Sequence, residues 1–166
     1  MKSFISHQLY HCAAAISVGT NPDRFKDYAA KIRSAIEAVP GIEFIFQLNS
    51  ETQSVFDIIS VDPPTNMSVL FDASCGLGIE INYLPHPSGT VPCGYAGGIG
   101  PRNLQNILKM ISDLELTTDD KVWIDMESSL RAIRSDKHVS NEEYFSIDTC
   151  FACIILCVEA GMPVAS

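Results

Sequence analysis

The chain has 166 residues, 46% of them hydrophobic, so it can bury one core and we expect a single domain over residues 1–166. Its net charge of −9 disfavours a nucleic acid or an anionic membrane surface as a partner, because either needs a basic face. A small anionic ligand stays open, since backbone amides and one or two arginines can bind a phosphate locally.

Residues 12–19 are a strand candidate, and the chain after them predicts a helix. Asn21 supplies a capping signal before an apolar stripe at helical spacing, and the helix should end at Pro40. The stripe consists of Phe25, Tyr28, Ala29, Ile32 and Ile36. The apolar run at residues 42–49 predicts a strand, and residues 51–59 predict a short helix.

The second half of the chain continues this alternation. Strands are expected at residues 68–74, 92–97 and 121–127. A helix is expected to start at Pro101, because proline is favoured at the first helical position, and to run to about Leu114. The remaining segments are a loop rich in Pro and Gly at residues 78–91, a charged loop at residues 131–138 and a final helix at residues 141–161.

Three stretches, which begin at Val69, Pro92 and Val122, carry most of the functional information. Each is a short apolar run that ends abruptly in polar or Gly residues. Such a run predicts a buried strand whose C-terminal end opens into a functional loop. The stretches recur about every 25 to 30 residues with helical segments between them, which is the pattern of repeated βα units.

These motifs resemble the last three strands of the phosphoribosylanthranilate isomerase-like branch of the phosphate-binding (β/α)8 barrels. The motifs at residues 71–76, 93–98 and 123–127 are more similar still to an uncharacterised, bacterial-type side branch of that superfamily. The resemblance covers residues 40–160 and implies an α/β fold with a parallel (β/α) barrel. A complete barrel needs at least about 200 residues. We therefore expect an incomplete TIM barrel with about the last four to five βα units.

Polar residues recur at the ends of the expected strands. Alternate side chains of a barrel strand point to the lumen and to the helices. If the alternation is set so that the polar residues face the lumen, three pairs of side chains lie at the C-terminal mouth of the barrel. These pairs are Gln47 and Asn49, Asp72 and Ser74, and Asp125 and Glu127. Catalytic residues of this fold lie at that mouth, and Gly97 and Gly98 leave room between them.

Asp72 is the candidate catalytic residue. Its context, Leu70-Phe71-Asp72, resembles the Leu-Leu-Asp of the isomerases, and the resemblance implies a general acid for a ring-opening Amadori rearrangement. The alternative is an aspartate that caps the loop after it through its own backbone.

The segment from Gly97 to Asn103 resembles the Gly-Gly-Leu-x-Pro-x-Asn phosphate-binding turn of the family. Glycines let the backbone approach an anion, and the amides at a helix start point toward it. The candidate phosphate-binding residues here are Gly97, Gly98, Gly100, Arg102 and Asn103. A plain strand-to-helix turn and an exposed first-turn Arg102 are the alternatives.

Ser128 lies where the isomerases have a Ser-Ser-Gly segment that completes the phosphate site, so the resemblance makes it a further candidate. Three features depart from the family. Glu127 would repel a phosphate if it pointed inward. The family's Gly-Gly-Thr-Gly loop after the aspartate is replaced by Cys75-Gly76-Leu77-Gly78, and Cys12, followed by Ala13, does not match the family's Cys-Gly general base.

Two functions follow as hypotheses. The first is binding of a phosphorylated small molecule, with isomerisation of a phosphoribosyl-type substrate if the barrel is complete; no cofactor and no metal are implied. The alternative is a catalytically inactive barrel remnant that acts as an interaction or assembly module. An open sheet exposes strand edges, so we expect self-association or a further N-terminal segment to cover them.

The six cysteines indicate a reducing compartment. Cys150, Cys153 and Cys157 share one helical face, which predicts a buried face of small side chains rather than a metal site. The chain is not a small, loop-rich disulfide framework, and no apolar run approaches the roughly 18 residues of a membrane span. We therefore expect reduced thiols and a cytoplasmic protein.

Overall fold

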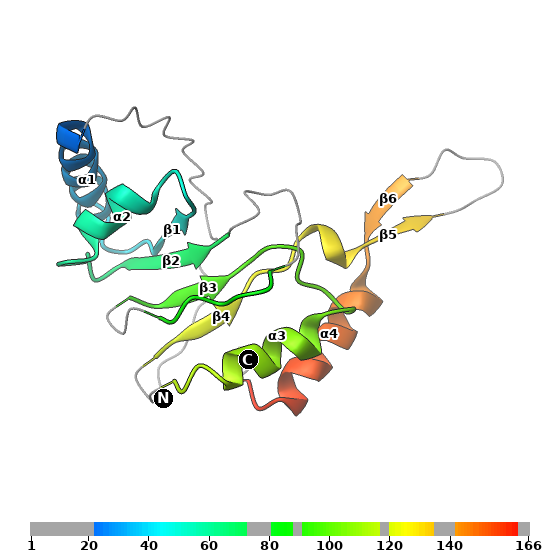
Figure 1. The fold of residues 1–166 in the computed structure, drawn as a ribbon. Helices are drawn as coiled ribbons and strands as arrows, with labels where there is room; N and C mark the ends of the chain where they lie inside the picture. Colours follow the sequence, from blue (N-terminus) through cyan, green and yellow to red (C-terminus); the bar gives the residue numbers. More distant parts are fainter. Residues whose placement is uncertain (1–21, 73–80, 88–90, 117–119, 135–141, 163–166) are drawn as a thin grey trace.

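The computed structural model describes residues 22–72, 81–87, 91–116, 120–134 and 142–162. Helices and strands alternate through most of this part of the chain (Figure 1). In chain order they are α1 (Pro22–Glu37), β1 (Phe44–Leu48), α2 (Gln53–Ile59), β2 (Met67–Phe71), β3 (Cys93–Tyr95), α3 (Leu104–Ser112), β4 (Val122–Ile124), the 3-10 helix η1 (Ser128–Leu130), β5 (Arg131–Arg134), β6 (Glu142–Phe145) and α4 (Ile147–Glu159). The strand candidate at residues 12–19 lies outside the described residues.

Four strands form one parallel sheet in the order β1-β2-β3-β4, which is also their order along the chain. Phe46 pairs with Val69, Val69 with Cys93, and Cys93 with Val122. The predicted α/β class and its parallel strands are therefore confirmed. The described strands form an open sheet and do not close into a barrel.

The helices pack on one face of this sheet. Crossovers between parallel strands are right-handed, so a sheet whose strands follow each other in chain order receives every crossover on the same side. A single hydrophobic cluster accordingly joins alternate strand residues, such as Leu48, Val69 and Tyr95, to residues of all four helices. Figure 1 shows α1 and α2 beside β1 and β2, and α3 and α4 at the other end.

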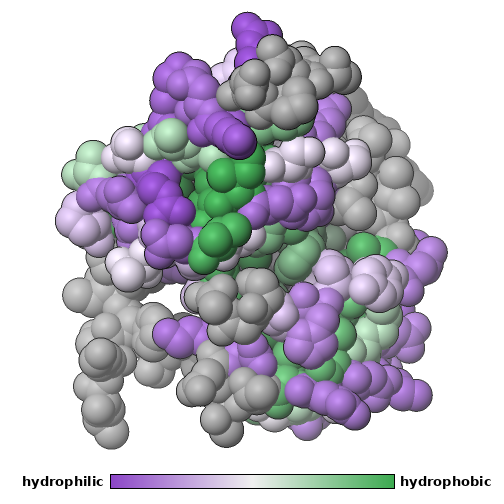
Figure 2. Space-filling model, turned by 60° about the vertical axis from the view of Figure 1, so that its left-hand side comes forward, coloured by the Kyte–Doolittle hydropathy of each residue, from purple (hydrophilic) through white to green (hydrophobic). Residues whose placement is uncertain are grey.

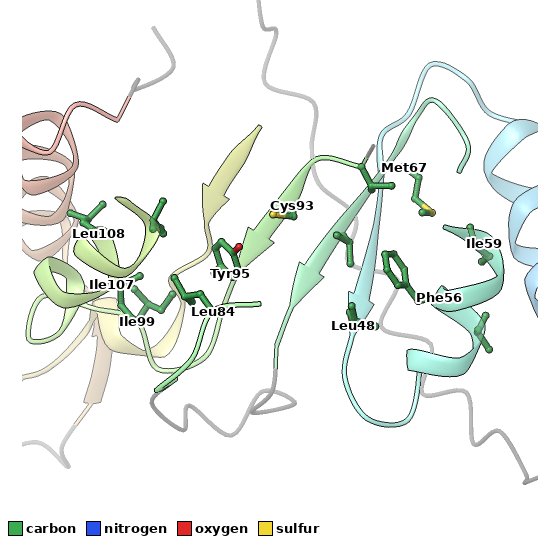
Figure 3. Close-up of a cluster of buried hydrophobic side chains, with 14 of the residues drawn as sticks. Leu48, Phe56, Ile59, Met67, Leu84, Cys93, Tyr95, Ile99, Ile107 and Leu108 are labelled. Carbon is green, nitrogen blue, oxygen red and sulfur yellow. The ribbon is translucent and has the colours of Figure 1, made fainter. Parts of the chain in front are cut away.

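The core is elongated along the sheet. Figure 3 shows Phe56 and Ile59 of α2 at one end of the cluster and Ile107 and Leu108 of α3 at the other, with Tyr95 between them. Two ring pairs connect neighbouring elements: Phe46 with Phe56, 5.7 Å apart, and Phe71 with Tyr95, 5.6 Å apart. The stripe predicted for the first helix is confirmed, since Ala29 and Ile36 are buried and its other members pack on them.

The opposite face of the sheet carries a second, smaller set of buried residues. Leu70 and Ala96 are 3% and 6% exposed, yet neither belongs to the main cluster. Trp123 of β4 lies across Gly94 of β3 so closely that a Cβ at Gly94 would overlap the indole ring. Ser68, also buried on this face, donates a hydrogen bond to a Glu43 carboxylate oxygen.

Two sequence predictions about the C-terminal region are wrong. The described part of the expected charged loop, residues 131–134, is strand β5, which pairs antiparallel with β6. The final helix begins at Ile147 rather than at residue 141, because residues 142–145 are extended in that pairing. Ser146 ends the strand and caps α4, its Oγ accepting a 3.2 Å hydrogen bond from the Thr149 amide.

The predicted face of cysteines on the last helix is confirmed. Cys153 is buried against the main cluster, and Cys150 and Cys157 pack partly into it. Burial raises the pKa of the Cys153 and Cys157 thiols, which keeps them protonated at neutral pH and lowers their reactivity. Cys93, on β3, is buried as well, and desolvation raises its pKa to about 11.

The face of the sheet opposite the helices is largely shielded from water, since Leu70 is buried and Ile45 is half-buried. Figure 2 shows a mostly hydrophilic face in which hydrophobic side chains gather in a narrow central strip and in smaller groups. Among the described residues, no helix combines the length and the hydropathy that a bilayer span requires.

Gly94→Ala should destabilise the fold by about 1–3 kcal/mol, because the new methyl group must displace the Trp123 ring from the sheet. Trp123 is the single tryptophan, so its fluorescence in a urea titration reports both the local change and global unfolding. Gly41→Ala is the matched control, since nothing lies within 4 Å of its added Cβ. Equal unfolding midpoints for the two variants would contradict this packing.

Candidate functional site

The carboxyl ends of the four parallel strands meet at one edge of the sheet, and backbone pairing continues beyond three of them. The Asp72 amide donates to Leu48 O (3.2 Å), the Ala96 amide to Phe71 O (2.9 Å) and the Asp125 amide to Tyr95 O (3.0 Å). Residues 72, 96 and 125 are therefore held in a row at this edge. The polar residues that the sequence predicted at the mouth of the barrel lie on or next to this row.

Asp72 and Gln47 are brought into direct contact. Gln47 Nε2 donates a 2.7 Å hydrogen bond to Asp72 Oδ2, and the Asp72 side chain is buried, with 6% exposed. Alternation places both side chains on the sheet face opposite the helices. A positioned, buried carboxylate at this edge is suited to proton transfer once a substrate reaches it. The loop that Asp72 would cap in the alternative hypothesis, like Ser74, lies outside the described residues.

Asn49 has a structural role in the turn between β1 and α2. Its Oδ1 accepts hydrogen bonds from the amides of Glu51 (2.9 Å) and Thr52 (3.1 Å), and Thr52 Oγ1 donates to Gln47 O (2.8 Å). Such an arrangement is an Asx turn, which orders a loop through the side chain that starts it. The turn fixes the strand end that presents Gln47 to Asp72.

The turn after β3 has the conformation that the glycines suggested. Gly97 and Gly98 have φ values of 112° and 58°, in the left-handed region that residues with a Cβ adopt at a cost. Asn103 then holds the turn closed: its Oδ1 accepts from the Gly100 amide (2.9 Å) and its Nδ2 donates to Gly98 O (3.1 Å). Sequence analysis assigned Asn103 to a ligand, and the structure gives this side chain two partners inside the turn.

The helix after this turn begins later than predicted. Pro101 was expected at its first position, but α3 starts at Leu104. The Gly100 carbonyl accepts hydrogen bonds from the amides of both Asn103 (3.1 Å) and Leu104 (2.9 Å), which makes residues 100–103 a separate turn. Arg102, in that turn, is exposed, as the alternative hypothesis for this residue stated.

Gly100 connects this turn to the segment that contains Ser128. A Cβ at Gly100 would overlap the Cβ of Ser129 in η1, so the backbone of one segment lies directly on the side chain of the other. Ser128 and Glu127 are exposed next to this contact, and Asp125 is half-buried at the preceding strand end. Two segments that are almost 30 residues apart in the sequence therefore form one continuous surface.

Some of the amides in this turn already have partners. Gly100 and Asn103 donate within the turn, and Pro101 has no N–H. In the part of the chain that the structure describes, no hydrogen bond involves the amides of Gly98, Ile99 and Arg102 as donors. The donor set that an anion can use is therefore smaller than the full run from Gly98 to Asn103.

In the described ranges, no three His, Cys, Asp or Glu side chains lie close enough together to hold a metal ion.

Comparison with protein-family models, with curated proteins and with solved structures finds no match for this chain. The site must therefore be interpreted from its own geometry.

Sequence reasoning missed the close approach at Gly100. Only the pattern Gly-x-x-Asn, with Asn103 three residues after Gly100, carried a signal that a side chain closes the turn. Nothing in the local sequence indicated that the glycine also makes room for Ser129, because that contact joins two separate βα units.

Gly100→Ala should separate the turn from η1 and lower the free energy of unfolding by about 1–3 kcal/mol. Ser129→Gly removes the side chain that the new methyl group would meet, so the double variant should recover most of this loss. A double-mutant cycle on urea midpoints would then give a coupling energy of about 1 kcal/mol or more. Additive effects of the two substitutions would contradict the contact.

Proposed function

We propose that this protein binds a phosphorylated small molecule at the surface formed by residues 97–103 and Ser128. The proposal rests on the packing of Gly100 against Ser129. This contact brings Gly97 and Gly98, which have left-handed φ angles, close to the segment that contains Ser128 and Ser129. Backbone amides next to glycines can approach a phosphate closely because no Cβ intervenes.

The chemistry of the surface supports an anion despite the acidic chain. The amides of Gly98 and Arg102 and the exposed hydroxyl of Ser128 are neutral donors, and the exposed Arg102 guanidinium adds a positive charge. Helix α3 starts directly after the turn, and its positive dipole end favours negative charge nearby. Exposed Glu127 opposes binding, so the affinity for inorganic phosphate should be modest.

We further propose that the sheet is the C-terminal portion of a (β/α) barrel and that Asp72 supplies the acid of a sugar-phosphate isomerase. Support comes from strands in chain order, from helices on one face, and from the Gln47–Asp72 pair on the other. In this mechanism Asp72 protonates the ring oxygen of a phosphoribosyl-type substrate as the ring opens. The general base of the rearrangement would have to come from outside these four strands.

A second candidate function is a catalytically inactive interaction module. It is favoured by the apolar side chains that α4 exposes, which an enzyme that works alone does not need. Both candidates fit a cytoplasmic location, since the described cysteines are free thiols.

Phosphate binding can be tested by NMR titration of the labelled chain at constant ionic strength. We expect amide shifts at Gly98 and Arg102 that saturate at millimolar phosphate, because neutral amides and one arginine bind an anion weakly. Chloride at matched ionic strength is the control. Unshifted amides at tens of millimolar phosphate would refute the proposed site.

Glu127→Gln should strengthen phosphate binding several-fold at low salt, because it removes a like charge next to Ser128. Glu159→Gln, which removes the same charge from the end of α4, is the matched control and should leave the affinity unchanged. An equal gain in both variants would show only the effect of net charge and would place the phosphate elsewhere.

Asp72→Asn should reduce kcat for phosphoribosylanthranilate by about 100-fold or more while KM and phosphate binding stay nearly constant. Asparagine retains an oxygen that can accept from Gln47 Nε2, so the fold should be preserved. Circular dichroism checks the fold in parallel. An unchanged kcat would remove Asp72 from the mechanism, whereas phosphate binding without turnover in the natural sequence would favour the inactive module.

A further inference from the structure

Helix α4 exposes an apolar stripe on the side away from its cysteines. The stripe consists of Ile147, Phe151, Ile154, Ile155 and Val158. These residues follow the i, i+4, i+7, i+8, i+11 spacing, which gathers them within about 100° of the helix circumference. Their exposed fractions range from 43% to 77%. The α4 stripe is therefore a surface feature, distinct from the Cys153 side that packs in the core.

The hairpin β5–β6 lies next to the start of α4 and exposes further apolar side chains. In Figure 1 the hairpin projects from the body of the molecule, and β6 leads directly into α4. Phe145 pairs with Arg131, and Ile133 pairs with Glu143, so alternation places Phe145 and Ile133 on the same hairpin face. Both are 61% exposed. Two-stranded hairpins are marginally stable in water, so this one gains from packing on another surface.

The area of this combined surface approaches that of a stable interface. Seven side chains of this size, each about half exposed, offer on the order of 700 Å² of apolar surface. Monomeric proteins rarely expose a contiguous apolar patch larger than about 600 Å². A standard interface buries about 800 Å² per partner, so the stripe and the hairpin face nearly suffice.

The charge distribution favours a partner with the same kind of surface. None of the five stripe residues is charged, and the acidic residues of α4, Asp148 and Glu159, lie near its two ends along one edge of the stripe. The stripe itself therefore offers a charged partner no counter-charge at its centre, whereas the hairpin face also carries the Arg131–Glu143 ion pair, 3.5 Å long. In a dimer with a two-fold axis through the stripe, the apolar face of α4 packs on the same face of the second copy, so both faces are buried together.

We propose that a second copy of this chain packs on the α4 stripe, so that the protein forms an isologous dimer through α4 and the hairpin face. The sheet edge with Asp72 and the turn at Gly98 belong to other elements, so the proposed contact does not involve these residues. The net charge of −9 on each chain opposes association at long range. Added salt screens this repulsion and should therefore strengthen the dimer.

Sedimentation of the full chain between about 1 and 100 μM should show a monomer–dimer equilibrium. Phe151→Glu should weaken it on the order of 100-fold, because it places a charge in the centre of the apolar contact. Val61→Glu is the matched control: Val61 is 84% exposed but lies between α2 and β2, and its substitution should leave the equilibrium unchanged. Circular dichroism checks that both variants keep the fold.

Ile154→Lys gives an independent second test with the opposite charge, and it should also yield monomers. A natural chain that stays monomeric throughout this concentration range would overturn the proposal and leave the α4 stripe for a different partner protein. A dimer that persists in both stripe variants would overturn it too, because the contact would then lie elsewhere.

Discussion

The arrangement of this protein depends on the strict alternation of side chains in a parallel sheet whose strands follow each other in chain order. Right-handed crossovers place every helix on one face, so that face must be apolar in all four strands. Phe46, Val69 and Tyr95 satisfy this requirement. The residues one position away point to the other face, where a few polar groups, such as Gln47 and Asp72, are tolerated because they bond to each other.

Glycines determine how closely neighbouring elements approach on the functional side of this framework. Gly94 makes room for the Trp123 ring within the sheet, and Gly100 makes room for Ser129 beside it. Asn103 then closes the turn through two side-chain hydrogen bonds. The candidate anion surface is consequently built by backbone shape and neutral donors, which explains how an acidic chain can present it.

The molecule has two surfaces with different physical characters. The strand-end edge has polar side chains held by short hydrogen bonds, whereas α4 exposes a stripe of uncharged apolar side chains and the hairpin exposes Ile133 and Phe145 beside an ion pair. Helix α4 packs its cysteine side in the core and turns its other side to solvent, so it is apolar almost all round. The proposed binding at the first surface and the proposed association through the second can therefore be tested separately.

The sequence by itself determined the elements and their periodicity. The helical stripe from Phe25 to Ile36, the parallel strands and the buried cysteine face of α4 were all predicted, because each depends on residues that are close in the chain. The glycine turn at Gly97 and Gly98 was also predictable, since only glycine adopts left-handed φ angles readily. The contact of Gln47 with Asp72 was predictable as well, because the alternation of side chains in the two neighbouring strands places both residues on the same sheet face.

Only the tertiary structure decided the remaining features. The β5–β6 hairpin replaced an expected loop because strand pairing across residues 131–145 depends on the partner strand and not on local propensity. The burial of Leu70 and the contact of Gly100 with Ser129 involve surroundings that the local sequence does not specify. The exposure of the other α4 face was equally hidden, because its apolar residues are as compatible with burial against another part of the chain as with exposure.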